Sequence, residues 1–309
     1  MGNLPEQRLN PSHPFDVVGV DYAGPFLIKN HTGRGAKVSK CYVALYICFL
    51  TKAVHLELVT SLSKDAFIKK ISRKGKPSTI FSDNGTNELK ELSTFFIKNN
   101  LELITSASNE GIDWHFIPPQ SPHFGGLWEA GVKSMKSHLK RVVGGVSLTF
   151  EQLYTLLVEI EAIMNSRPLS PISSDPEDLA PLTPGHFIIG KQLSPVPGTD
   201  VIDGPVNRLT IYQHLQQMKQ HIWKRWMKEY IAELQQRSKW RLNYDSLKEG
   251  VLVLIKDDNL PPMKWKLGRV LTVFLGKDKV SRVALVKTDR GNITRCFSKL
   301  CPLPLSNLV

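Results

Sequence analysis

The sequence has 309 residues, of which 41% are hydrophobic and 22% charged, and a net charge of +12. This length suits one large domain or two to three ordinary ones, and the composition is that of a globular protein. The four cysteines form neither a C-x-x-C pair nor a disulfide framework. No apolar run is long enough to span a bilayer, and the N-terminus lacks the apolar segment of a signal peptide. We therefore expect a soluble intracellular protein, not a secreted or membrane-spanning one.

The net positive charge comes entirely from the last third of the sequence. Residues 208–309 hold 20 of the 40 Lys and Arg but only 8 of the 28 Asp and Glu, which accounts for the whole net charge. A neutral body followed by a basic segment indicates an attached module that binds a polyanion. Nucleic acid is favoured over a basic surface without a partner.

Strand and helix patterns alternate along the first 145 residues. β-Branched and aromatic runs predict strands, and two runs separated by a short turn predict a hairpin. The order is β-β-β-α-β-α-β-α, which is typical of a mixed sheet with helices on its faces. The predicted elements are strands at 15–22, 40–49, 53–59, 79–83 and 112–117, and helices at 63–72, 88–99 and 127–143.

A different pattern follows the long helix. Thr149 and Gln152 fit a capping box, which predicts a helix that ends near Asn165. Residues 166–207 are rich in Pro, Ser, Asp and Gly and are expected to form a linker or an extended surface wrap. The apolar spacing over residues 210–237 predicts one long helix. Short strands that suit a small β-barrel are then expected at 251–256, 268–274, 281–288 and 292–297.

Three acidic residues fall where an α/β sheet binds its ligands. Asp21 is expected to end the first strand and Asp83 the fourth, and these two strands should lie side by side and parallel. Taken alone, each Asp is better explained by its preference for turns at strand ends, and the joint arrangement is what favours a site. Glu129, on the helix packed against this sheet, adds a third carboxylate. Together the three can hold Mg²⁺ or Mn²⁺, two ions of which assist phosphodiester chemistry.

Candidate DNA contacts surround these acids. Lys133, Lys136 and Lys140 follow Glu129 on one helix face, where they suit phosphates; a solvated lysine face is the alternative. The other face is apolar and is expected to pack on the sheet, through Trp128, Val132, Met135, Leu139 and Val143. Gln120 and His123 lie in the Pro- and Gly-rich loop before the helix, and we consider both as DNA contacts, although a surface histidine is the favoured interpretation of His123.

Two further groups of residues have a functional and a structural interpretation. The basic cluster Lys69, Lys70, Arg73, Lys74 and Lys76 suits a nuclear localisation signal, but a solvated helix end is favoured. Four tryptophans in the basic third could stack on bases; they are Trp223, Trp226, Trp240 and Trp265. For the first two, one turn apart on an apolar helix face, we expect core packing instead.

Several long stretches resemble a known family. GVDYAGPF (19–26), FSDNGTN (81–87) and HFIPPQSPHFGGLWEAGVKSMKSHLKRV (115–142) closely resemble integrase cores of Pao/BEL long-terminal-repeat retrotransposons. NSRPL (165–169) and LTPGHFIIG (182–190) resemble segments that follow the core in such polyproteins. The basic tail resembles the small uncharacterised domain at their end, so the resemblance covers nearly the whole chain.

The resemblance implies a fold, an activity and a set of site residues. It implies an α/β fold with a ribonuclease-H-like mixed sheet, helices on both faces, a long helix and a small SH3-like β-barrel. The expected domains are a catalytic core at 1–165, a linker at 166–207 and the basic helix and barrel at 208–309. Asp21, Asp83 and Glu129 would be catalytic and bind two Mg²⁺ or Mn²⁺ ions. The activity would be DNA 3′-end processing and strand transfer by a nuclear homo-oligomer acting on element ends and target DNA.

The sequence departs from the family in three places. The His/Cys zinc-binding motif expected before such a core does not occur in these 309 residues. The helix between Ser63 and Gly75 is shorter than expected, and residues are missing after Asn87. Because shortened helices support the acids less well, we expect a folded DNA-binding protein that is slow or inert in strand transfer. Two alternatives stay open, a ribonuclease-H-type nuclease and a non-catalytic DNA-binding remnant.

The charge distribution generates a testable prediction. Deleting residues 208–309 should weaken DNA binding and flatten its salt dependence, by roughly one unit of slope for each phosphate that the shortened chain no longer neutralises. Fluorescence anisotropy of a labelled duplex over a salt series, with the full chain and with residues 1–207, measures both quantities. Equal affinity and an equally steep slope for residues 1–207 would contradict the prediction.

Overall fold

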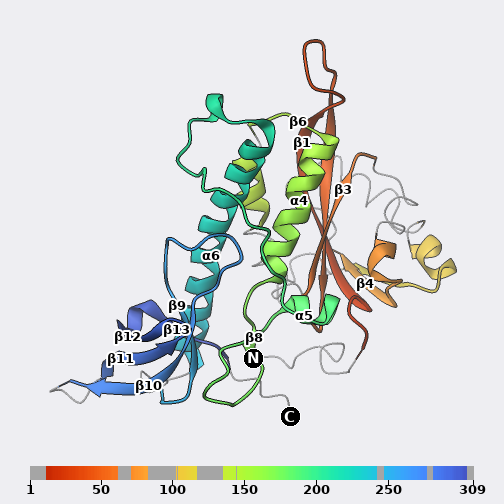
Figure 1. Ribbon diagram of the computed structural model, residues 1–309. Coiled ribbons are helices and arrows are strands. Elements are labelled where there is room, and N and C mark those ends of the chain that lie inside the picture. The colour runs from red at the N-terminus through yellow and green to blue at the C-terminus, as the bar shows by residue number, and fades with distance from the viewer. Residues whose placement is uncertain are drawn as a thin grey trace. The chain divides into compact units, whose positions relative to one another are not determined.

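The computed structural model describes residues 12–61, 71–82, 102, 104–116, 135–143, 145–241, 247–276 and 281–304 (Figure 1). Two compact units divide the chain, Met1–Met164 and Asn165–Val309. The helix predicted at 88–99 and most of the one at 63–72 lie outside the described residues. Among the described helices, none combines the length and apolar character that crossing a membrane requires.

A mixed sheet forms the centre of the first unit (Figure 1). Its strand order is β3-β2-β1-β4-β5, with β6 paired to the far part of β1. The β1–β2 and β2–β3 pairs are antiparallel, whereas β1–β4 and β4–β5 are parallel. This is the strand order of ribonuclease-H-like sheets, so the predicted mixed α/β sheet is confirmed. The strands are β1 (Val17–Lys29), β2 (Val38–Cys48), β3 (Val54–Val59), β4 (Thr79–Ser82), β5 (Asp113–Phe116) and β6 (Leu148–Thr149).

The first strand is longer than predicted. Its expected end was near Asp21, before Gly24 and Pro25, but β1 continues to Lys29. The pairing with β2 is interrupted between Ala23 and Phe26 and then resumes. Such a bulge absorbs the extra residues, and Gly24 permits it with a φ of 130°. The placement of Asp21 at a strand end was therefore wrong, because a bulge replaces the expected stop.

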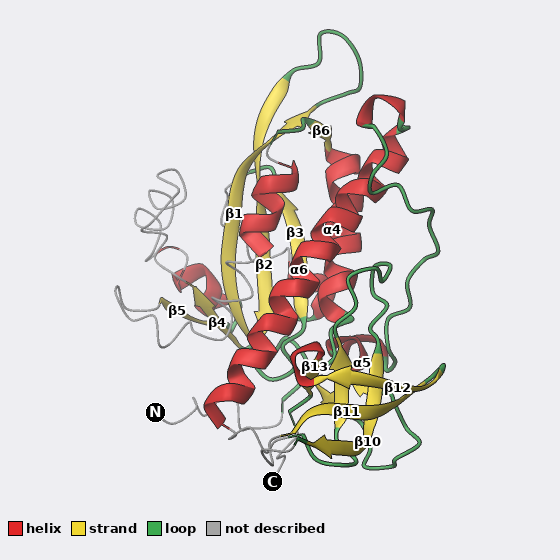
Figure 2. Cartoon of the chain, turned by 90° about the vertical axis from the view of Figure 1, so that its left-hand side faces the viewer, coloured by secondary structure: helices red, strands yellow, loops and turns green. Residues whose placement is uncertain are grey.

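Helix α4 (Phe150–Asn165) lies along the sheet (Figure 2). Its predicted capping box is confirmed, since the Thr149 N–H donates to Gln152 Oε1 at 3.0 Å and the Gln152 N–H donates to Thr149 Oγ1 at 3.3 Å. Its inner face is apolar and buried, through Leu153, Leu156, Leu157, Ile160 and Ile163. Residues 135–143 are also helical, and the predicted apolar face is confirmed there by buried Met135, Leu139 and Val143.

An ionic network centred on a buried histidine joins α4 to β3. His55 is only 2% exposed; its Nδ1 donates to Glu161 Oε2 at 2.9 Å, and its Nε2 lies 3.4 Å from Glu57. Arg73 pairs with Glu57, and Lys74 Nζ lies 3.2 Å from Glu161 Oε1. The basic cluster singled out in the sequence thus contributes two side chains to this network.

Opposite charges set the protonation of this network. Burial by itself lowers the pKa of His55, but the hydrogen bonds and charges of Glu161 and Glu57 outweigh it, so that the pKa is raised above its ordinary 6.5. Burial raises the pKa of both glutamates, but their hydrogen bonds to His55 and the neighbouring charges of His55, Arg73 and Lys74 together outweigh it, so that the pKa of each is lowered. The network thus places His55, whose pKa is raised, between two carboxylates whose pKa values are lowered.

Stability should consequently depend on pH through His55. Because its pKa is raised in the folded state, the stabilisation is fully present below 6.5 and is lost as the pH rises through the higher folded value. Urea unfolding of the full chain at about pH 6 and about pH 9 should show a loss of about 1 kcal/mol at the higher pH. The His55→Gln variant, which cannot titrate, should lose this dependence; an unchanged pH profile would contradict the assignment.

The second unit combines a long helix with an antiparallel sheet. Helix α6 (Ile211–Arg241) confirms the predicted helix and extends it. The sheet order is β12-β11-β10-β9-β13, and among the described residues β12 does not pair with β13 to close a ring. Strand β13 was not predicted from the sequence. The strands are β9 (Leu252–Ile255), β10 (Leu267–Leu275), β11 (Ser281–Thr288), β12 (Gly291–Cys296) and β13 (Leu300–Pro302).

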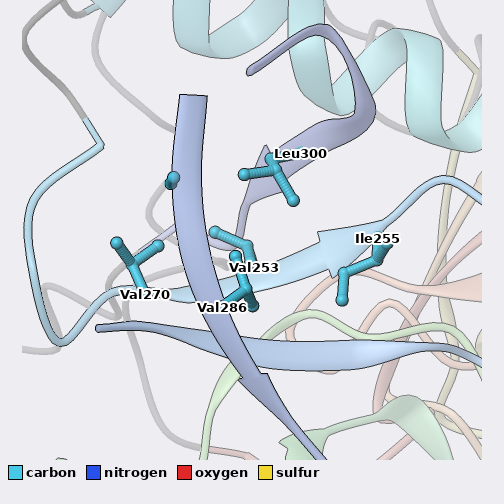
Figure 3. Close-up of a cluster of buried hydrophobic side chains, with 6 residues drawn as sticks. Val253, Ile255, Val270, Val286 and Leu300 are labelled. Carbon is cyan, nitrogen blue, oxygen red and sulfur yellow. The ribbon is translucent and has the colours of Figure 1, made fainter. Parts of the chain in front are cut away.

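Aliphatic side chains from four strands form the core of this sheet (Figure 3). Val253 and Ile255 come from β9, and Leu300 comes from β13. The group is completed by Val270, Ala284 and Val286, all at most 1% exposed. In β9 and β11 the core members are alternate residues, Val253 with Ile255 and Ala284 with Val286, as expected for side chains on one face of a strand.

The segment predicted as a linker or wrap contains short elements, and α6 binds the loop that precedes the last of them. The Gln217 side chain donates to the carbonyl oxygens of Val201, at 3.0 Å, and Gly204, at 2.7 Å. Gln220 donates to the Thr199 carbonyl and accepts from the Val201 N–H. These elements are β7 (Ser170–Pro171), β8 (Pro181–Leu182), α5 (Pro184–Ile189) and the 3-10 turn η3 (Val206–Arg208).

An aromatic cluster fixes a loop to α6. The Trp265 ring meets Trp223, Trp226 and Tyr230 edge to face, at centroid distances of 4.8, 5.9 and 5.7 Å. Trp223 and Trp226 are 2% and 4% exposed, so the expectation that they pack in a core is confirmed. The indole N–H groups of Trp223 and Trp265 donate to Leu260 O and Ser166 Oγ. Trp240 lies among side chains that the structure does not describe.

Candidate active site

The register of two parallel strands places the candidate site. β1 pairs with β4 through Val17↔Thr79, Val18↔Ile80, Gly19↔Phe81 and Val20↔Ser82. Asp21 follows directly after the last of these pairs on β1, and Ser82 is the residue before Asp83 in the sequence. The prediction that strands one and four lie side by side and parallel is confirmed. Asp83 itself lies outside the described residues.

Asp21 presents a half-buried carboxylate at the end of this pairing. Its Oδ1 accepts from the Tyr22 N–H at 2.7 Å, and its Oδ2 lies 2.5 Å from Lys136 Nζ. The side chains of Asp21 and Lys136 are 26% and 32% exposed, so solvent reaches both. The carboxylate therefore already has a cation as a direct neighbour.

The helix at 135–143 holds Lys136 in this position. Met135 and Leu139, on either side of it along the helix, are each 1% exposed and anchor the helix in the first unit. Lys136 was predicted to contact DNA phosphate, and in the structure its ammonium pairs with Asp21. The spacing of seven residues between Glu129 and Lys136 was the sequence signal that placed this lysine on the face of the acids. Lys140, one turn further on, is exposed.

A buried hydrogen bond supports the strand that leads to Asp83. The Trp114 indole N–H, on β5, donates to Ser82 Oγ at 2.8 Å. Both side chains are buried, at 5% and 1% exposure. Because β5 pairs in parallel with β4, this bond fixes the last residue of β4 against the next strand. No local pattern in the sequence indicated this contact.

The other predicted site residues lie outside the described residues. These are Gln120, His123, Glu129 and Lys133, together with Asp83. Within the part of the chain that the structure describes, no cluster of three or more His, Cys, Asp or Glu side chains could hold a metal. Of the predicted triad, the structure therefore describes Asp21 alone.

The chain is similar to one protein family, over part of its length, and to solved structures. Residues 210–303, which run from the start of α6 to β13, match a family described as "Family of unknown function (DUF5641)". No curated protein matches the chain.

Three solved structures are similar at low sequence identity. A simian T-cell lymphotropic virus intasome in complex with PP2A regulatory subunit B56 gamma matches at 14% identity over 97% of this chain and 87% of that chain, with a TM-score of 0.36. The HTLV-2 integrase catalytic core domain in complex with magnesium matches at 15% over 57% and 97%, with a TM-score of 0.33. The BIV integrase catalytic core domain matches at 13% over 57% and 95%, with a TM-score of 0.36. The fold assignment rests on strand order and pairing.

The Ser82–Trp114 bond generates a stability prediction. Ser82→Ala and Trp114→Phe should each lower the free energy of unfolding by about 1 to 2 kcal/mol, because each removes one partner of a buried hydrogen bond. The double variant should lose less than the sum, with a coupling of about 1 kcal/mol in urea unfolding. Ser78→Ala, which removes an exposed hydroxyl near the start of β4, is the matched control. Additive losses would show that the two side chains do not interact.

Proposed function

We propose that this chain is an integrase-type polynucleotidyl transferase. It would trim the 3′ ends of an element's DNA with water and then join the new 3′ hydroxyl groups to target DNA. The chemistry is an in-line displacement at phosphorus, without a covalent enzyme intermediate. Asp21, Asp83 and Glu129 would be its catalytic carboxylates.

The single observation that carries the proposal is the β1–β4 register. Its last pair, Val20↔Ser82, brings together the residues that precede Asp21 and Asp83 in the sequence. Ligands of α/β sheets bind outside the ends of such parallel strands. The motifs GVDYAGPF and FSDNGTN, which resemble retrotransposon integrase cores, contain these two aspartates. Position and motif therefore support the same chemistry.

Asp21 has the donor chemistry that a divalent ion requires. It offers a hard carboxylate oxygen, partly open to solvent, which contacts a cation, the Lys136 ammonium, at 2.5 Å. Asp83 and Glu129 would complete the ligand set for two Mg²⁺ or Mn²⁺ ions. When bound, such ions stabilise the attacking and leaving oxygens of the phosphodiester. The protein's own part is to hold Asp21 on β1, directly after its parallel pairing with β4.

The second unit would hold DNA through its phosphates. Many of its basic side chains are exposed; they include Arg208, Lys224, Arg225, Lys248, Lys264, Arg290, Arg295 and Lys299. Exposed Lys and Arg bind phosphates without regard to sequence, which suits a module that grips element ends and target DNA. Two DNA segments must be held at once, so a homo-oligomer on nuclear DNA is the proposed active form.

A strand-transfer assay tests the proposal. The purified full chain, with Mg²⁺ or Mn²⁺, should join a labelled duplex to plasmid DNA, slowly because of the shortened helices. Asp21→Asn, Asp83→Asn and Glu129→Gln should each reduce joining by about a hundredfold or more, and removing the metal with a chelator should abolish it.

A control variant and a second substrate distinguish the proposed reaction from the alternatives. Asp113→Asn changes an exposed aspartate on the neighbouring strand β5 and should leave joining unchanged. Joining that survives Asp21→Asn would refute the assignment of the site. Cleavage of an RNA–DNA hybrid without any joining would favour the ribonuclease-H-type nuclease instead, and DNA binding without either reaction would favour the remnant.

A further inference from the structure

One ion pair connects the candidate metal site to a candidate DNA contact. Lys136 Nζ lies 2.5 Å from Asp21 Oδ2, and the two residues come from the helix at 135–143 and from β1. The lysine is held there by its helix, whose neighbouring Met135 and Leu139 are buried. The ammonium therefore lies against the oxygen that the proposed function assigns to a metal ion.

We propose that Lys136 is a positioning residue that couples DNA binding to metal binding, an inference that rests on the proposed function. Before DNA arrives, Lys136 neutralises Asp21 and competes with a divalent ion for its Oδ2. When a DNA phosphate approaches, it attracts the ammonium away from Asp21, and the carboxylate becomes free to bind the ion. DNA binding and metal binding then strengthen each other.

Electrostatic repulsion supports a competition between the Lys136 ammonium and a divalent ion that is large enough to change metal affinity. A divalent cation placed on Asp21 Oδ2 would lie within a few ångströms of a like charge, and repulsion at such distances is considerable even near a protein surface. The pair is about one-third exposed on the lysine side, so the ion pair itself is weak enough to break. Solvent access also gives the lysine room to turn outward toward a phosphate. A strong, fully buried pair would block the site, whereas this one can regulate it.

Metal affinity, measured without any reaction, tests the coupling. Mn²⁺ binding to the full chain is followed by the electron paramagnetic resonance signal of free Mn²⁺. Lys136→Gln should bind Mn²⁺ roughly three- to tenfold more tightly than the unmodified chain, since one competing charge is gone. Lys136→Arg should stay close to the unmodified chain, because it keeps the charge.

Arg141→Gln is the matched control for charge removal. It takes one positive charge from an exposed position on the same helix, five residues and thus more than a third of a turn around from Lys136. It should leave Mn²⁺ affinity within about twofold of the unmodified chain. Thermal melting of all variants checks that each is folded to the same extent.

A short DNA duplex supplies the second arm. In the unmodified chain the duplex should tighten Mn²⁺ binding at Asp21, and in Lys136→Gln this effect should be smaller, because coupling between two ligands is reciprocal and depends on the shared lysine. The Asp21→Asn protein with the same duplex gives the Mn²⁺ taken up by DNA itself. That amount is subtracted.

The outcomes separate this inference from the proposed function. Tighter Mn²⁺ binding by Lys136→Gln but not by Arg141→Gln supports the coupling. Unchanged or weaker binding by Lys136→Gln, with binding abolished by Asp21→Asn, overturns the coupling and leaves the metal site in place. Mn²⁺ binding that Asp21→Asn does not reduce overturns both.

Discussion

The parallel pairing of β1 with β4 is the constraint on which the rest of the first unit depends. β1 occupies the centre of the sheet, antiparallel to β2 on one side and parallel to β4 on the other. Its register sets Val20 opposite Ser82 and leaves Asp21 as the next residue. The Trp114–Ser82 hydrogen bond fixes β4 from its other side. A slip of one residue would turn every side chain of β1 to the opposite face of the sheet. It would therefore disrupt the candidate site and the core at the same time.

Charge is handled in two different ways in the first unit. The His55, Glu57 and Glu161 network is largely closed to water, and its charges compensate one another to fasten α4 to β3. Asp21 and Lys136 are partly open to water, and their pair is correspondingly exchangeable. Buried pairs hold a structure because breaking them leaves a charge without compensation, whereas exposed pairs are easily replaced by a ligand. Of these two groups, the Asp21–Lys136 pair is thus the one more open to exchange with a ligand.

In the second unit, side chains fasten irregular segments by hydrogen bonds to backbone carbonyls. Arg269 is only 5% exposed and donates to the Gly250 carbonyl at 2.8 Å and the Asp178 carbonyl at 2.7 Å. Gln217 does the same for the loop at 199–204. Such bonds need no particular partner side chain, so the composition of the Pro- and Ser-rich segment carried little sign of them. That composition predicted irregular structure, and the long-range contacts made it ordered.

The sequence by itself determined the features that depend on local signals. These are the strands, the capping box of Thr149 and Gln152, the position of α6 and the apolar helix faces. Each depends on neighbours within a turn or a strand, where side-chain periodicity is strict. The tertiary structure alone decided that β1 runs on past Gly24, because the bulge exists only against β2. It also decided the meeting of His55 with Glu161, 106 residues away, and of Lys136 with Asp21. These contacts join residues far apart in the chain, and only the packed sheet brings their side chains together.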